Sequence, residues 1–249
     1  MITRTEIIGV GVNPTSYLES VSWIAQWAQN KESRYVCVAN VHVIMEAHDS
    51  SDFRKIVNSA DLVTPDGMPL VWSLRALGVG GQTRVYGPEL TLRLIEAAAK
   101  KEIPIGLYGG SPETLQCLLA VFKQRYPALN IAYSYSPPFR TLTAEEDEAV
   151  IREINASGVR ILLVGLGCPK QERWMAEHKG RIQAVMLGVG AAFDFIAGIK
   201  QQAPHWMQEN GLEWLYRLSQ EPRRLWRRYL YHNPRFLALI TLQLLSKKK

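Results

Sequence analysis

The sequence has little of what a disulfide framework, a membrane-spanning helix or a secreted protein needs. Only three of its 249 residues are cysteine, and no two have Cys-x-x-Cys spacing, so we expect a reducing, cytoplasmic setting. The longest nearly apolar run, Phe236–Leu245, includes Thr241 and Gln243 and is far shorter than the roughly 20 residues that cross a bilayer. Residues Met1–Glu6 contain no apolar segment, which predicts no signal peptide.

Familiar nucleotide and metal motifs are also missing. There is no Walker A motif and no complete Gly-x-Gly-x-x-Gly, which argues against a P-loop NTPase and a nicotinamide-dependent dehydrogenase. The aspartates include no Asp-x-Asp pair, and the five histidines form no His-Glu-x-x-His motif or Cys/His cluster. We therefore expect neither a metal nor a cofactor.

Positive charge is concentrated at one end of the chain. The formal net charge is +6, but residues 217–249 contain nine Lys or Arg and one acidic residue, so this tail carries +8. The remaining residues carry −2. A basic segment on a near-neutral body predicts a localised anionic partner such as phosphate, nucleic acid or a membrane surface.

Short apolar runs alternate with longer amphipathic stretches, which predicts α/β architecture with a mostly parallel sheet and a Rossmann-like core. The run Ile161–Val164 is continuously apolar, as in strands that are buried on both faces. The predicted strands are Glu6–Val12, Arg34–Ala39, Asp61–Val63, Ile103–Tyr108, Leu129–Ser134, Val159–Gly165 and Ala184–Gly188.

Two breaks divide the predicted chain into three parts. One lies near the glycine-rich segment Gly78–Gly81 and the other near Gly198–Pro204. We predict an N-terminal α/β lobe (1–80), a Rossmann-like lobe (81–202) and a basic, amphipathic C-terminal helical appendage (203–249).

Polar and glycine-rich residues follow five of the predicted strands, where parallel sheets bind ligands. Gly109-Gly110-Ser111 precedes a predicted helix and can present backbone N–H groups to a nucleotide diphosphate. The same glycines equally suit a tight turn that needs them for backbone reasons.

Asp66 follows a predicted strand between Pro65 and Gly67. Its carboxylate suits a general base that takes a proton from an acceptor hydroxyl, although an Asx-turn or helix cap is the commoner role. His42 also follows a strand, and a lone histidine is more often structural than catalytic. Cys168 has no base beside it in sequence, so we do not interpret it as a nucleophile.

The basic tail predicts an interfacial helix. From Arg223, a helical wheel gathers four arginines on one side, with Leu225, Trp226, Tyr229 and Leu230 opposite. The following apolar run and Lys247–Lys249 favour an anionic membrane surface over a solvated face or nucleic acid, so we expect no nucleic-acid partner. A homo-oligomer is compatible with the sequence.

Seven motifs in register over nearly the whole chain resemble the WecG/TagA/CpsF glycosyltransferase family. Each is weak alone, and together they are specific. They are Asn40, Ala60-Asp61-Leu62 with Pro65-Asp66-Gly67, Arg84–Gly87, Gly109-Gly110, Gly165–Glu172, Gly188-Val189-Gly190 with Phe193-Asp194, and Gly211–Leu218.

This resemblance implies an inverting, metal-independent hexosyltransferase of cell-wall or exopolysaccharide synthesis. It implies transfer of N-acetylmannosamine or a related sugar from a UDP-sugar to a polyprenyl-diphosphate-linked sugar, by a peripheral enzyme on the cytoplasmic membrane face. It also implies that Asp66 is the base. Where many members have a glutamate two residues after the asparagine, this chain has His42, which leaves the sugar open.

With this resemblance, the candidate residues fall into two groups. The catalytic candidates are Asp66, Asn40, Arg84 and Gln171. The nucleotide-binding candidates are Gly109, Gly110, Gly167, Lys170, Gly190, Asp194, Arg217, Arg224 and Arg227. The alternative is a nucleotide-binding, membrane-associated regulatory or scaffolding protein without catalysis, which would tolerate asparagine at position 66.

Overall fold

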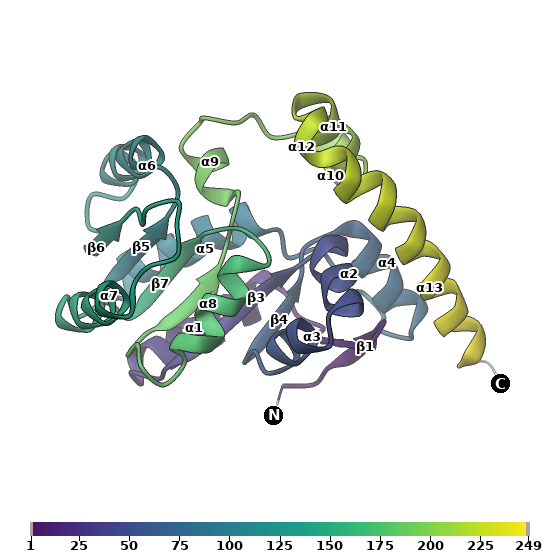
Figure 1. The fold of residues 1–249 in the computed structure, drawn as a ribbon, viewed down its shortest axis with the longest axis horizontal. Coiled ribbons are helices and arrows are strands. Elements are labelled where there is room, and N and C mark those ends of the chain that lie inside the picture. Colours follow the sequence, from purple (N-terminus) through teal and green to yellow (C-terminus); the bar gives the residue numbers. More distant parts are fainter. Residues whose placement is uncertain (1, 248–249) are drawn as a thin grey trace. The chain divides into compact units, whose positions relative to one another are not determined.

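Six strands form the main sheet of the protein, which the computed structural model describes over residues 2–247 (Figure 1). The strand order is β4-β3-β8-β7-β5-β6, and the four pairs from β3 to β6 are parallel. The strands are β3 (Arg34–Ala39), β4 (Leu62–Pro65), β5 (Ile105–Gly109), β6 (Ile131–Tyr135), β7 (Ile161–Gly165) and β8 (Val185–Gly188). The predicted α/β architecture with a parallel sheet is confirmed.

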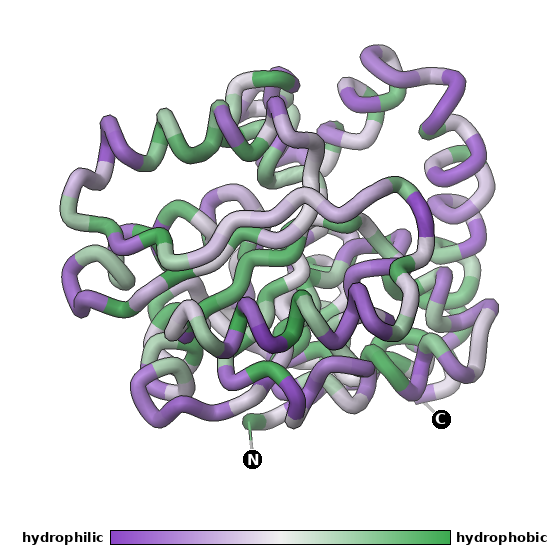
Figure 2. The backbone as a smooth tube through the Cα atoms, turned by 60° about the vertical axis from the view of Figure 1, so that its left-hand side comes forward, coloured by the Kyte–Doolittle hydropathy of each residue, from purple (hydrophilic) through white to green (hydrophobic). Residues whose placement is uncertain are grey.

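The central strands are apolar because both of their faces are covered. Residues Ile161–Val164 of β7 and Val185–Gly188 of β8 are buried, as expected for strands in the middle of a parallel sheet. Figure 2 shows such hydrophobic stretches in green, flanked by hydrophilic segments in purple.

The chain divides into two compact units. Unit 1 contains the residues up to Ser16, Val38–Tyr86 and those from Gln202 onward, and unit 2 contains Tyr17–Cys37 and Gly87–Gln201. Strand β3 contributes its last two residues to unit 1 and the rest to unit 2. The predicted three-part division at residues 80 and 202 stays a prediction.

Unit 1 begins with a short hairpin instead of the predicted single strand Glu6–Val12. Strands β1 (Thr5–Ile7) and β2 (Val10–Val12) pair antiparallel. Ile8 and Gly9 have positive φ angles of 48° and 80° and turn the chain between them. The single-strand prediction is therefore wrong, because the apolar residues on both sides of Gly9 belong to different strands.

Besides β4 and the end of β3, the other elements of unit 1 are helical. A helix that the sequence did not predict begins directly after β3, where the side chain of Asn40 accepts hydrogen bonds from the backbone N–H groups of His42 and Val43. The helices are α2 (Val41–Asp49), α3 (Ser51–Asn58), α4 (Met68–Ala76), α10 (His205–Glu209), α11 (Glu213–Gln220), α12 (Pro222–Trp226), the π-helix η1 (Arg227–Tyr231) and α13 (His232–Ser246).

Unit 2 contains the remaining helices. The helix predicted after Gly109-Gly110-Ser111 is confirmed: Ser111 Oγ accepts from the Thr114 N–H at 3.1 Å, and Pro112 is the first helical residue. These helices are α1 (Tyr17–Gln29), α5 (Gly87–Lys100), α6 (Pro112–Arg125), α7 (Ala144–Ala156), α8 (Lys170–His178) and α9 (Ala192–Ile196).

The basic C-terminal helices are part of the core of unit 1 as well as its surface. Leu225, Phe236 and Ile240 are buried, whereas Trp226 and Leu230 are exposed. Two members of the predicted apolar face, Leu225 and Tyr229, thus pack inward. Within the described residues, no helix has the length and apolar character needed to cross a membrane. Lys248 and Lys249, which belong to the predicted basic tail, lie outside the described residues.

Candidate active site

A pocket that is open to solvent lies within unit 1. Three of the four catalytic candidates, Asn40, Asp66 and Arg84, line it together with Arg217, one of the three candidate arginines of the tail. Residues of α2, α4, α10, α11, η1 and α13 complete the wall. The fold thus assembles one site from three segments that are far apart in sequence.

At the centre of this site, one guanidinium joins two carboxylates. Arg84 Nη2 donates to Asp66 Oδ1 at 3.0 Å and to Glu213 Oε2 at 2.6 Å, and Arg84 Nε donates to the Asp66 backbone carbonyl. The Arg84 guanidinium also lies 4.0 Å from the ring centroid of Tyr86. The side chains of Asp66, Arg84 and Glu213 are only 14–16% exposed, so their geometry is closely fixed.

The backbone holds Asp66 at the end of β4. Its N–H donates to the Ala39 carbonyl at 2.8 Å, and the Val85 N–H donates to the Pro65 carbonyl at 2.9 Å. Because the segments around Asp66 and Arg84 are tied to the same strand end, their side chains meet in a defined orientation.

Burial changes the acid–base behaviour of Asp66. Desolvation raises its pKa from 3.8 to about 6, and the neighbouring Glu213 charge also raises it, while Arg84 opposes the increase. A carboxylate with a pKa near 6 is largely ionised at neutral pH and still accepts a proton readily, which suits a general base.

Close backbone packing brings Glu213 to this pocket. Gly211 has a φ angle of +69°, and a Cβ there would lie 2.6 Å from Trp72 Cη2 on α4. Glycine therefore lets the chain pass over Trp72 just before α11 begins, two residues before Glu213.

The glycine-rich candidates lie in unit 2. Gly109, at the end of β5, has a φ angle of +107°, and a Cβ there would lie 2.8 Å from the Gly165 carbonyl carbon. The Gly110 N–H donates to the Gly165 carbonyl at 3.2 Å. Both glycines thus meet a backbone requirement, and the Gly110 amide already has a protein acceptor.

Gln171, the fourth catalytic candidate, forms hydrogen bonds that hold the neighbouring loops in place. The Gly167 N–H donates to Gln171 Oε1 at 3.0 Å, and Gln171 Nε2 donates to Glu172 Oε1 at 2.9 Å. A Cβ on Gly190 would lie 3.4 Å from the same Gln171 oxygen. The side chain is 5% exposed, so the structure shows a loop-positioning role for it.

Two further candidates in unit 2 are on helices. Lys170 is the first residue of α8 and is exposed. Asp194 is on α9 and forms an ion pair with Lys200 at 2.8 Å.

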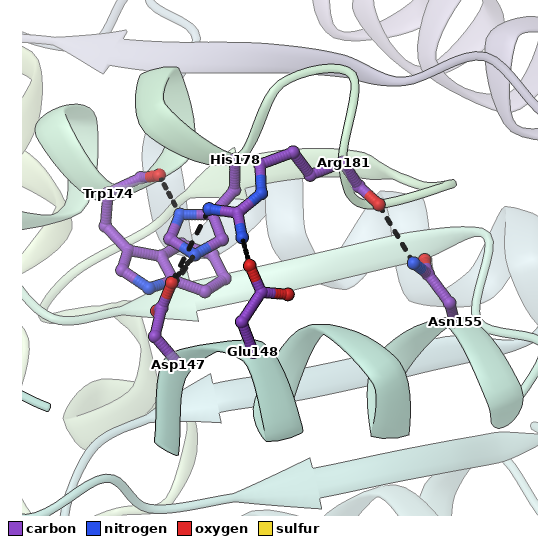
Figure 3. Close-up of polar contacts among 6 residues, drawn as sticks. All are labelled: Asp147, Glu148, Asn155, Trp174, His178 and Arg181. Carbon is purple, nitrogen blue, oxygen red and sulfur yellow. Dashed lines mark hydrogen bonds and ion pairs between the residues drawn. The ribbon is translucent and has the colours of Figure 1, made fainter. Parts of the chain in front are cut away.

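A second charged cluster is present on unit 2 (Figure 3). Asp147 of α7 accepts from His178 Nε2 at 3.0 Å and lies 3.7 Å from Arg181 Nη1. Arg181 also pairs with Glu148, and its carbonyl accepts from Asn155 at 2.9 Å. This cluster joins α7 to the end of α8.

The comparisons with known proteins agree with the resemblance. The glycosyl transferase WecG/TagA/CpsF family matches residues 5–249. The chain belongs to this family. Relatives from Staphylococcus aureus strains MW2 and NCTC 8325 / PS 47 are each 27% identical to it over 227 residues, covering 90% of this chain and 87% of the relative. Both are named N-acetylglucosaminyldiphosphoundecaprenol N-acetyl-beta-D-mannosaminyltransferase.

The tail arginines of this WecG/TagA/CpsF family member have different surroundings. Arg217 and Arg228 line the pocket. Arg224 is exposed and pairs with Glu221, and Arg227 is exposed with its guanidinium 5.3 Å from the Trp226 ring centroid. Arg228, which the sequence reading did not select, thus joins Arg217 at the pocket.

Glu213 is the other charged pocket residue that is not among the sequence-based candidates. It stands in the block Glu213–Arg217 that carried part of the resemblance. Sequence order gave no sign that it would share Arg84 with Asp66, since 129 residues separate Arg84 from Glu213.

Proposed function

We propose that this protein is an inverting glycosyltransferase that transfers N-acetylmannosamine or a related sugar from a UDP-sugar to a polyprenyl-diphosphate-linked sugar. The names of the Staphylococcus aureus relatives contain both the diphosphoundecaprenol acceptor and the N-acetylmannosaminyl group. We extend this acceptor and this sugar to the present chain because the family match, residues 5–249, includes every residue that lines the pocket.

The observation that carries the proposal is Asp66 in its pocket. Inversion needs an acceptor hydroxyl to attack the sugar from the side opposite the leaving UDP. Asp66, with its pKa raised to about 6, takes the hydroxyl proton as the C–O bond to the sugar forms and the bond to UDP breaks. Arg84 holds the carboxylate in place and keeps it charged.

We propose that arginines stabilise the negative charge that develops on the leaving UDP. The departing UDP gains negative charge, and fixed cations stabilise it in the transition state. Arg217 and Arg228, both at the pocket, are the first candidates. Arg224 and Arg227, together with the glycine-rich loops of unit 2, remain proposed nucleotide-binding residues.

The test is a transfer assay with UDP-N-acetylmannosamine and a short-chain polyprenyl-diphosphate-linked N-acetylglucosamine. Wild-type protein should form the disaccharide with inversion and release one UDP per transfer. Release of UDP without a disaccharide would point to another acceptor. No turnover, combined with no effect of UDP on the melting temperature, would contradict the proposal and favour the scaffolding alternative.

We also propose that the C-terminal helices bind the anionic face of the membrane. Trp226 and Leu230 are exposed beside Arg223 and Arg227, and each basic residue near anionic lipid contributes about 1 kcal/mol. Because Leu225 and Phe236 are buried in unit 1, point substitutions test this better than truncation.

Vesicle co-sedimentation gives a direct measurement. Arg223→Gln with Arg227→Gln should reduce binding to phosphatidylglycerol vesicles by roughly 10- to 30-fold, from the loss of about 2 kcal/mol. Lys123→Gln with Arg125→Gln removes the same charge from exposed positions on α6 and should leave binding unchanged. Equal loss in both double variants would show that the tail is not the binding surface.

A further inference from the structure

Three potential metal ligands come together in unit 1, beside the pocket but outside the Asp66 cluster. His42 and Glu46 lie one turn apart on α2, a spacing that puts both side chains on one helix face. His232 is the first residue of α13, which packs against α2. One ligand atom from each of the three lies within 4.8 Å of the other two.

The distances between these side chains suit a metal better than direct hydrogen bonds. Glu46 Oε1 is 3.7 Å from His42 Nδ1 and 3.7 Å from His232 Nε2, and both separations exceed a hydrogen bond. Ligands 2.0–2.1 Å from a tetrahedral zinc ion lie about 3.4 Å from one another. Small side-chain movements would bring the three atoms to that separation.

The local environment also suits bound metal. The two imidazoles are largely buried, at 14% and 11% exposure, and Glu46 is 33% exposed, so an ion would have a shielded site with access from solvent. The nearby Arg235 is paired with Asp49 at 2.8 Å, which offsets its charge. Arg228 is a further cation on the adjoining pocket wall, so we expect weaker affinity than at a closed four-ligand site.

We propose that His42, Glu46 and His232 bind a divalent transition-metal ion of the zinc class. Two imidazoles and one carboxylate form a ligand set that zinc accepts, with the fourth tetrahedral position left for water. The ion would join α2 to α13 and fix His42, which lines the pocket. This site is separate from the proposed Asp66 chemistry and does not depend on it.

His205 and Glu209 on α10 supply an internal comparison. They have the same spacing, and His205 Nδ1 lies 3.4 Å from Glu209 Oε1. Both are exposed, and within the described residues the His42–Glu46–His232 group is the one set of three such ligands whose atoms converge. A histidine–glutamate pair without a third ligand should bind zinc weakly.

The experiment uses the full chain after removal of metal with a chelator. Wild-type protein should take up one equivalent of Zn²⁺ in titration calorimetry, and Co²⁺ should give the visible absorption bands of a four- or five-coordinate site. Glu46→Gln and His232→Gln should each weaken Zn²⁺ binding at least 10-fold, while His205→Gln should leave it unchanged.

Two results would overturn the proposal. The first is wild-type uptake well below one equivalent at micromolar Zn²⁺. The second is equal affinity in wild type and Glu46→Gln, which would assign the uptake to other groups. If His232→Gln does not fold, the partly exposed Glu46 still provides the test, with circular dichroism checking its fold.

Discussion

Two clusters in this protein join carboxylates to basic side chains, and they differ in burial and in what surrounds them. In unit 1, Asp66 and Glu213 share Arg84, all three side chains are at most 16% exposed, and they line a pocket. In unit 2, Asp147 and Glu148 share Arg181 (Figure 3), which is 41% exposed. None of these three residues lines that pocket.

Ion pairing alone does not mark a reactive site. The buried cluster raises the pKa of Asp66 toward the physiological range, and its carboxylate faces space that a ligand can fill. In the unit 2 cluster the pairs that Arg181 forms with Asp147 and Glu148 are partly exposed, and ion pairs screened by solvent contribute little to stability. Matched substitutions in the two clusters test that distinction.

The largest expected difference is in catalysis. Asp66→Asn removes the proposed base and should lower kcat by about 10²- to 10⁴-fold, while UDP binding and the circular dichroism spectrum persist. Asp147→Asn is the matched change in the other cluster and should alter kcat by less than about twofold. Wild-type turnover in Asp66→Asn would eliminate Asp66 as the base, and loss of its fold would instead indicate a structural role.

The next difference is in stability. Arg84→Met leaves two carboxylates side by side in a poorly solvated site, and we expect the free energy of unfolding at pH 8 to fall by about 3 kcal/mol. Arg181→Met removes a half-exposed cation and should cost less than about 1 kcal/mol. Urea denaturation of both variants measures this contrast, and equal losses would show that burial does not separate the clusters.

Much of the fold could be predicted because its signals are local. The continuous apolar run Ile161–Val164 predicts a buried strand, and Ser111-Pro112 predicts a helix start; both are confirmed. The helix that begins after Asn40 is not predicted, because the polar residues after that strand are interpreted only as part of a ligand-binding edge of the sheet. In fact Asn40 caps the helix that begins there.

The site was less predictable because its decisive contacts are long-range. Local sequence identified Asp66 after a strand, but its commonest role there is a turn or cap. The Arg84–Glu213 pair at 2.6 Å and the burial that raises the pKa of Asp66 arise when the C-terminal helices pack onto the rest of unit 1. His232 approaches His42 for the same reason.

The pH dependence of the two clusters should differ as well. Because folding raises the pKa of Asp66 from 3.8 to about 6, the folded state holds this proton more tightly than the unfolded state. The stability that this group contributes is therefore present below about pH 4 and is lost as pH rises to about 6, by up to roughly 3 kcal/mol. Asp66→Asn should flatten this part of the stability profile, whereas Asp147→Asn should leave it in place.

The smallest expected effect concerns the acid limb of the rate profile. Activity needs ionised Asp66, so kcat/KM should fall about tenfold per pH unit below pH 6. Glu213→Gln removes a negative charge that raises the pKa of Asp66, so the limb should move to lower pH. Glu148→Gln is the matched change in the exposed cluster and should not move the limb. A limb that stays at the same pH in Glu213→Gln would mean that Asp66 is not the group that titrates there, even if Asp66→Asn is inactive.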